Sequence, residues 1–176
     1  ALIGKFFGFL AGKFLTWSFV YAPWIAQAWA DKRGVSRGDP AFVALGKPLS
    51  ELKIGLITTG GVHHPDDQAF RGKEESPSGD GSWRKLDLPR LQHDYEITHD
   101  WYEHKDARED LNLVLPYQRL TELAQEGIIG SVHPVGVGIM GHVEAAEEQR
   151  LELVSAPEVA GLMQGEAVDA VLLVPA

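Results

Sequence analysis

The chain has 176 residues, of which 44% are hydrophobic and 23% charged, which is enough for one folded domain with a sizeable core. Its formal charge of -9 argues against a nucleic-acid backbone as partner, because phosphate binding needs clustered Lys and Arg. Cysteine is absent, which excludes disulfides, thiolate metal sites and cysteine nucleophiles within these residues.

The first thirty residues are apolar and rich in aromatic rings. Residues 14–30 carry no charge, but they are at the short limit of the roughly 17–25 residues that a membrane span needs, and Pro23 interrupts them. On a helical wheel Lys5, Lys13, Thr16 and Gln27 share one sector, which leaves a wide apolar face. This pattern favours a helix on a membrane surface or on a partner subunit. An arm folded over its own domain or over a dimer mate fits the pattern equally well.

Residues 31–50 contain Gly, Pro and charge without periodicity, and they read as a linker. Residues 53–57 then predict a buried strand, which breaks at four small residues: Thr58, Thr59, Gly60 and Gly61. In an open α/β sheet, ligands bind beyond the carboxyl ends of strands. A glycine pair there lets backbone N–H groups approach an anion, and His63 adds a titratable side chain. A purely steric reason for the glycines is the alternative.

Residues 64–92 are rich in Pro, Gly, Ser, Asp and Glu, and they predict a long loop. Loops of this length in compact domains are usually functional lids or mobile segments. A tolerated surface insertion is the alternative, although Phe70 and Trp83 suggest that parts of the loop are held in place.

Residues 95–112 carry the densest polar chemistry: His99, Asp100, Tyr102, His104, Asp106 and Asp110. Imidazole and carboxylate groups suit a metal ion. However, His99 and His104 share neither a helix face nor a strand face, so they could bind one ion only from a loop. A hydrogen-bonded cluster in which carboxylates orient imidazoles ranks first. A solvated acidic helix start ranks second, and a metal site ranks third.

Two further units follow. Pro116 begins a helix that runs to Gln125, with Gly127 as its stop signal, and residues 128–132 resume a strand-like pattern. The next segment contains Gly136, Gly138, Met140, Gly141 and His142, and this glycine density indicates backbone passing close to a ligand or another chain. It is no dinucleotide fingerprint, because no helix follows directly. His133 and His142 read as structural.

The last unit begins with Ser155 and Glu158, which form a capping box, and Gly165 is the expected helix end. Residues 168–174 predict a continuously buried strand of the kind found in parallel sheets. If this strand runs parallel to residues 53–57, residues just beyond Ala176 would share a crevice with the Thr-Gly-Gly bend. A catalytic group is expected at that place, so the chain reads as a fragment, a processed piece or an inactive relative.

The fold class expected is therefore α/β: a mostly parallel open sheet with flanking helices, plus the aromatic N-terminal helical arm. The expected divisions are an arm (1–30), a linker (31–50) and an α/β domain (51–176) that is incomplete at its C-terminus.

Four segments together resemble a known family. KPLSELKIGLITTGGVH, THDWYEHKDAREDLNLVLPYQRLTELAQEGIIGSV, GIMGH and SAPEVAGLMQGEAVDAVLLVPA are similar, in this order, to the selenoprotein B family of glycine, sarcosine, betaine and D-proline reductases. The likeness covers residues 47–176. It implies an α/β reductase subunit that reductively cleaves a carbon–nitrogen bond of a small amino acid or betaine, together with other protein subunits and thiol reductants such as thioredoxin.

The resemblance also implies that a redox selenocysteine or cysteine follows the strand at 168–174, beyond Ala176, so no cofactor is expected within this chain. The alternative function is a non-catalytic accessory subunit of a larger, membrane-associated complex, anchored by residues 1–30. A metal-dependent hydrolase that uses His99 and His104 ranks third. The expected location is the cytoplasm, with attachment to the inner membrane surface as the alternative.

Carried over by position, the resemblance implies the following roles. His104 is the expected proton donor to the leaving amine, with Asp106 or Asp100 orienting its ring. Substrate binding is expected from Thr58, Thr59, Gly60, Gly61, His63, His99, Tyr102, Asp110, Asn112, Met140 and Gly141.

Overall fold

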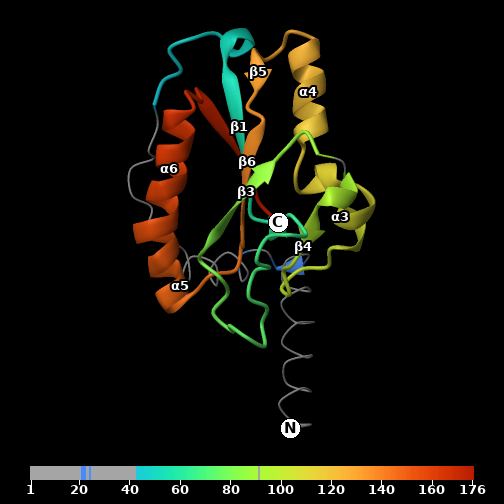
Figure 1. The fold of residues 1–176 in the computed structure, drawn as a ribbon, viewed down its shortest axis with the longest axis vertical. Coiled ribbons are helices and arrows are strands. Elements are labelled where there is room, and N and C mark those ends of the chain that lie inside the picture. Colours follow the sequence, from blue (N-terminus) through green and yellow to red (C-terminus); the bar gives the residue numbers. More distant parts are fainter. Residues whose placement is uncertain (1–20, 23, 25–42, 91) are drawn as a thin grey trace. The chain divides into compact units, whose positions relative to one another are not determined.

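The computed structural model describes residues 21, 22, 24, 43–90 and 92–176 (Figure 1). The chain divides into two units, Ala1–Ala44 and Leu45–Ala176, and the description below concerns the second. The predicted helical arm and most of the predicted linker lie outside the described residues, so both stay predictions. Within the described part of the chain, no helix has the length and apolar character needed to cross a membrane.

The main sheet is organised around β1 (Lys53–Thr58). Along one side β1 pairs in parallel with β5 (Ser131–Val132) and β6 (Val135–Ile139), and along the other with β7 (Ala170–Val174). β3 (Trp83–Asp87) pairs with β6 in the antiparallel direction (Figure 1). A second, two-stranded antiparallel sheet joins β2 (Val62–His63) to β4 (Glu96–Ile97).

The α/β class is confirmed, but the sheet is mixed rather than mostly parallel. The difference arises in the segment 64–92, which was expected to be a loop and contains β3. Gly- and Pro-rich chain before Trp83 turns the backbone round, so β3 runs against β6. Only Leu86 of this strand is buried, and antiparallel strands tolerate one solvated face in this way.

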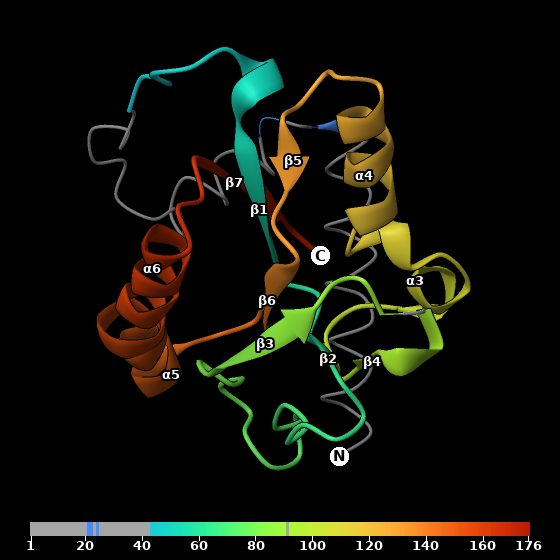
Figure 2. The ribbon, with the colours of Figure 1, turned by 45° about the horizontal axis from the view of Figure 1, so that its top comes forward.

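Helices cover both faces of the main sheet (Figures 1 and 2). On one face α3 (Lys105–Glu109) and α4 (Tyr117–Gln125) enclose the larger core, which includes Leu56, Leu86 and Leu120. On the other face α5 (Ala145–Arg150) and α6 (Ala156–Gly165) pack Val159 and Met163 against Val137. The predicted strand at 53–57 and helix at 116–125 are both confirmed.

The predicted capping box is wrong, because the helix does not begin at Ser155. α5 continues through a π-helical segment (Leu151–Ser155) into α6. Ser155 has helical backbone angles of φ -67° and ψ -43°, and its buried hydroxyl donates to the Gly81 carbonyl at 2.6 Å. Glu158 instead accepts from the Trp83 indole N–H at 2.8 Å. Tertiary contacts therefore use both side chains that were expected to cap the helix.

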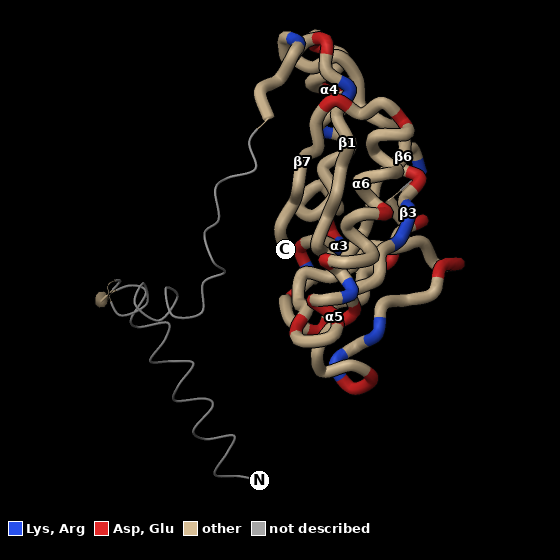
Figure 3. Tube along the Cα trace, turned by 90° about the vertical axis from the view of Figure 1, so that its left-hand side faces the viewer, with Lys and Arg blue, Asp and Glu red and all other residues tan. Residues whose placement is uncertain are grey.

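β7 forms where a strand was predicted, but it is an exposed edge strand rather than a buried one. It pairs with β1 from Ile54↔Ala170 to Thr58↔Val174, and nothing in the described part of the chain pairs with its other edge. Leu173 is 66% exposed, and Val171 and Leu172 are also exposed. No charged residue interrupts the strand (Figure 3). Charged side chains often protect such edges in natural sheets, so this one is suited to a covering segment.

The end of α6 provides a stability prediction. The predicted helix end at Gly165 is confirmed, and a residue with left-handed backbone geometry follows it, Ala167 at φ 52°. A Cβ is unfavourable there, so we expect Ala167→Gly to raise the free energy of unfolding by about 1 kcal/mol. Ala160→Gly, within α6, should instead lower it by about 1 kcal/mol. Urea denaturation measures both, and equal destabilisation by the two variants would contradict the strain at Ala167.

Candidate functional site

The carboxyl ends of β1 and β7 meet at one edge of the sheet, as the strand pattern predicted. The Thr59 amide donates to the Val174 carbonyl at 2.9 Å, and the Ala176 amide donates to Thr59 Oγ1 at 2.9 Å. Gly141 completes this rim, because a Cβ added there would come within 3.1 Å of Thr59 Oγ1 and 3.2 Å of the Ala176 carbonyl oxygen. The rim therefore joins three segments that are distant in sequence. We refer to these residues, Thr59, Gly60, Gly141 and Ala176, as the strand-end rim.

The backbone N–H groups of the bend are already used. Gly60 donates to Thr58 Oγ1 at 3.1 Å, Gly61 donates to the Ile139 carbonyl at 3.0 Å, and Thr59 donates to Val174. Gly61 adopts φ 67°, which turns the chain from β1 into β2. The bend thus forms a wall of the site. An anion bound nearby would need a donor other than these three amides.

His99 lies beneath the rim and is 3% exposed. Two backbone N–H groups point at its ring: that of Trp101 at Nδ1, at 3.3 Å, and that of Gly141 at Nε2, also at 3.3 Å. Burial lowers the pKa of His99, and charge on His142 acts in the same direction. A neutral imidazole accepts at only one nitrogen, so one of these approaches is not a full hydrogen bond, and a protonated ring would oppose both donors. His99 is therefore a neutral acceptor.

Aromatic rings surround His99. Its ring contacts Tyr102 edge-on at a centroid distance of 4.8 Å, and the Tyr102 hydroxyl donates to the Gly60 carbonyl at 3.0 Å. Trp101 stacks on His142 at 4.3 Å. His104 contacts Tyr102 edge-on at 5.6 Å. The histidine-rich segment thus reaches the rim through rings and backbone donors rather than through carboxylates.

The carboxylates expected to orient His104 make other contacts or none. Asp100 accepts the Lys73 amide at 2.7 Å, and Asp106 is exposed in the first turn of α3. Within the described residues neither carboxylate hydrogen-bonds to His104, so the predicted imidazole–carboxylate cluster is not what forms here. In the same residues, no group of three or more His, Asp or Glu side chains could hold a metal ion.

Three other predicted site residues have clear structural contacts. The Asp110 carboxylate accepts the Asn112 amide at 3.0 Å and so caps the short turn Leu111–Leu113. The buried His63 ring bridges the His64 carbonyl at 2.8 Å and Thr98 Oγ1 at 2.9 Å, which ties β2 to the end of β4. Met140 is buried and bridges to Gly60. The structure thus gathers Thr59, Gly60, Tyr102, His99 and Gly141, whereas Asp110 and Asn112 form a local turn.

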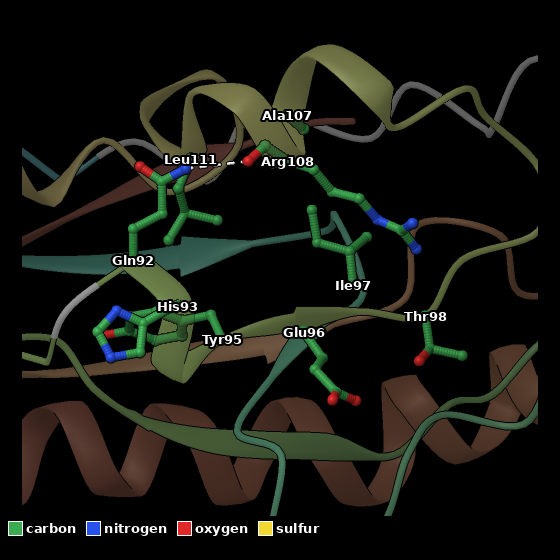
Figure 4. Close-up of a pocket in the computed structure, with 9 residues that line it drawn as sticks. All are labelled: Gln92, His93, Tyr95, Glu96, Ile97, Thr98, Ala107, Arg108 and Leu111. Carbon is green, nitrogen blue, oxygen red and sulfur yellow. Dashed lines mark hydrogen bonds between the residues drawn. The ribbon is translucent and has the colours of Figure 1, made fainter.

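A pocket of about 720 Å³ lies between β4 and α3, next to this site (Figure 4). Ile97 and Thr98 line it from the strand side, and Ala107, Arg108 and Leu111 line it from the helix side. The Thr98 amide donates to the Gly61 carbonyl at 3.0 Å, so one end of the pocket adjoins the bend. Sequence analysis missed Arg108, because an arginine within an acidic segment looks like any solvated charge.

His99 predicts a pH dependence of stability. Because burial lowers its pKa in the folded state, the unfolded chain takes up a proton first as the pH falls. The contribution of His99 is complete above its ordinary pKa of about 6.5 and decreases below it. We expect the loss of stability between pH 7.5 and pH 5.5 to be smaller in His99→Gln than in the wild type. Urea midpoints at both pH values measure this, and equal losses would contradict a neutral His99.

Most of the chain is similar to proteins of one known family. The model of the family "Glycine/sarcosine/betaine reductase selenoprotein B" matches residues 40–176. The γ subunit of D-proline reductase from Acetoanaerobium sticklandii is 30% identical over 134 residues, which cover 76% of this chain and 52% of the relative. The γ subunit of glycine reductase complex component B from Symbiobacterium thermophilum is 31% identical over 128 residues, 72% of this chain and 29% of the relative.

The β subunit of betaine reductase complex component B from Peptoclostridium acidaminophilum is 30% identical over 129 residues, 72% of this chain and 28% of the relative. The chain therefore spans about half the length of the first of these relatives and under a third of the other two. No solved structure matches it significantly.

Proposed function

The chain belongs to the glycine/sarcosine/betaine reductase selenoprotein B family, and we propose that it is the amino-terminal part of a reductase subunit that reductively cleaves a carbon–nitrogen bond. Its substrate would be a small amino acid or betaine. The named relatives, which are subunits of D-proline, glycine and betaine reductases, support both the reaction and the need for partner subunits.

The strand-end rim is the observation that carries this proposal. The redox cysteine or selenocysteine of the family would follow Ala176, whose amide already bonds to Thr59 Oγ1 at 2.9 Å. That residue would supply a thiolate or selenolate nucleophile and a thiol reductant would restore it. In this arrangement the nucleophile starts beside Thr59 and Gly141, above the neutral His99.

The residues of this chain would then have distinct tasks. Thr59, Gly60 and Gly141 form the wall, and Tyr102 fixes the Gly60 carbonyl at 3.0 Å. We keep His104 as the proton donor to the departing amine, because an imidazole transfers protons efficiently near neutral pH. No orienting role is assigned to Asp100 or Asp106, since Asp100 accepts the Lys73 amide and, within the described residues, neither carboxylate hydrogen-bonds to His104.

The edge of β7 with which no described residue pairs also supports a larger subunit. Its exposed Val171 and Leu173 line an apolar groove of about 390 Å³ together with Ile57 and Val159. Burying such a surface is worth about 25 cal/mol per Å², so a covering segment would stabilise the domain. We propose that the remainder of the subunit, or a partner chain, pairs with this edge.

The test is an activity assay on the intact gene product with its partner subunits and a dithiol. We expect amine release from glycine, sarcosine or betaine, or opening of the D-proline ring to an open-chain amino acid, and either reaction should depend on both substrate and reductant. His104→Gln should reduce this rate by about 100-fold. The control Arg119→Gln, at an exposed guanidinium on α4 that pairs with Glu122, should leave the rate unchanged.

If the carbon–nitrogen bond is cleaved in none of the four compounds, the reductase proposal is contradicted. That result would favour the alternative, a non-catalytic accessory subunit.

A further inference from the structure

We propose that Arg108 binds the carboxylate of the substrate, in the pocket between β4 and α3. The proposal rests on the proposed function and adds a residue that sequence comparison did not single out. The amides of Thr59, Gly60 and Gly61 already donate hydrogen bonds within the protein. A substrate carboxylate at this site therefore needs another donor.

The guanidinium of Arg108 is available for that purpose. It lines the pocket, and in the described residues no hydrogen bond or ion pair engages it. Three other arginines of the domain are paired: Arg71 binds Asp80 and Glu147, Arg90 binds Asp87, and Arg119 binds Glu122. A planar guanidinium can donate two parallel hydrogen bonds to one carboxylate, which makes arginine the preferred partner for that group.

Arg108 also points in the required direction. Its side chain extends from α3 toward the Thr98 end of the pocket (Figure 4), where the Thr98 amide bonds to Gly61. Burial raises the pKa of Tyr102, and the charge of Arg108 acts against that rise. Tyr102 in turn donates to Gly60 at 3.0 Å. Thr98 thus links the pocket to the bend, which Tyr102 also contacts.

Glu96, the acidic residue of the pocket lining, does not neutralise the charge of Arg108. Ile97 is buried beneath α3, and neighbouring strand residues point to opposite faces, so Glu96 is directed away from the helix (Figure 4). The other large polar pocket, of about 770 Å³ beside residues 68–75, suits an anion less well. Its wall includes Glu74, Glu75 and Asp100, and its Arg71 is already paired.

The carboxyl end of β7 lies on the same side of the main sheet as α3. Val174 packs against the core cluster that contains Ala107, and Tyr102 packs against that cluster too. A small substrate held by Arg108 near Thr98 would therefore present its amine-bearing carbon toward the rim rather than toward solvent. This gives the pocket one ligand class: small amino acids with a free carboxylate.

Equilibrium dialysis on the intact subunit, with its redox residue replaced by serine so that no turnover occurs, tests the assignment. The probes are the labelled zwitterions of the activity assay, and glycinamide, which lacks the carboxylate. We expect Arg108→Gln to weaken zwitterion binding at least tenfold and Arg108→Lys to weaken it less, because lysine keeps the charge but loses the bidentate geometry. Glycinamide binding should be equally weak in every variant.

Arg119→Gln is the matched control, since Arg119 lies on α4 and pairs with Glu122 at 3.0 Å. It should bind as the wild type does, and Arg108→Gln should keep the wild-type unfolding midpoint. Undiminished zwitterion binding by Arg108→Gln would overturn the assignment while leaving the reductase proposal intact. So would a wild-type subunit that is active but binds glycinamide as tightly as glycine. Failure of the reductase proposal shows separately, as missing cleavage of the carbon–nitrogen bond.

Discussion

Gly61→Ala is expected to lower the free energy of unfolding by about 4 kcal/mol, which combines a strained left-handed backbone with a clash. Gly61 has φ 67°, and a Cβ there would lie 2.4 Å from the Thr98 carbonyl oxygen and 2.9 Å from His99 Cβ. The oxygen belongs to the backbone, so relief requires the segment at Thr98 and His99 to move. Urea denaturation measures the loss, and amide chemical shifts of residues 98–102 should report the movement.

Gly127→Ala separates the two causes. Gly127 also has a positive φ, of 72°, but an added Cβ would meet nothing within 4 Å. Its cost should therefore be the backbone term alone, about 1 kcal/mol. If Gly61→Ala costs no more than Gly127→Ala, the close contact between the bend and His99 does not exist in solution.

Asp80→Ala should lower the free energy of unfolding by about 3–5 kcal/mol, because it removes the buried carboxylate that Arg71 and Ser82 both bind. Asp80 is 3% exposed and accepts the amides of Arg71 and Ser82 at 3.0 and 2.9 Å, together with the Ser82 hydroxyl. Arg71 then pairs with Glu147 at 2.7 Å, which anchors the loop before β3 to α5. The predicted loop, parts of which Phe70 and Trp83 were expected to hold in place, is therefore also held at Arg71 and Asp80.

The stability lost in Asp80→Ala should also depend on pH. Hydrogen bonds from Ser82 and Arg71 outweigh burial and hold the pKa of Asp80 far below its ordinary value. The unfolded chain is therefore protonated first as the pH falls, so the stabilisation is complete above about pH 5 and shrinks in acid. Asp87→Ala removes an exposed pair with Arg90 and should cost less than about 1 kcal/mol. Equal costs for the two variants, or a cost for Asp80→Ala that grows in acid, would contradict the buried network.

The elements with strong local signals could be predicted from the sequence. β1 is a short apolar run ended by glycines, and α4 has Pro before it and Gly after it, so both were found. β3 was missed because WRKLD buries only Leu86 and its context is rich in turn residues. The capping box failed because Ser155 donates to Gly81, which is distant in sequence. Long-range contacts of this kind leave no local pattern.

The candidate site could likewise be predicted only in part from the sequence. The meeting of Thr59 with Ala176 was predictable, because parallel strands end at the same edge of a sheet. The partners of His99 were not, since its Nε2 faces the Gly141 amide across 42 positions of sequence. Arg108 was missed for a different reason: it is an exposed arginine, and only the tertiary structure shows that it lines a pocket.

The shared rim of β1 and β7 can be tested most directly by a disulfide engineered into this cysteine-free chain. Thr59→Cys with Ala176→Cys pairs two residues whose atoms already meet at 2.9 Å. Lys53→Cys with Ala176→Cys pairs the first residue of β1 with a residue beyond the carboxyl end of the parallel strand β7. Under mild oxidation the first pair should form an intramolecular disulfide, seen by mass spectrometry, and the second should remain reduced. Equal cross-linking of the two pairs, or none in the first, would contradict the shared rim and the proposed site with it.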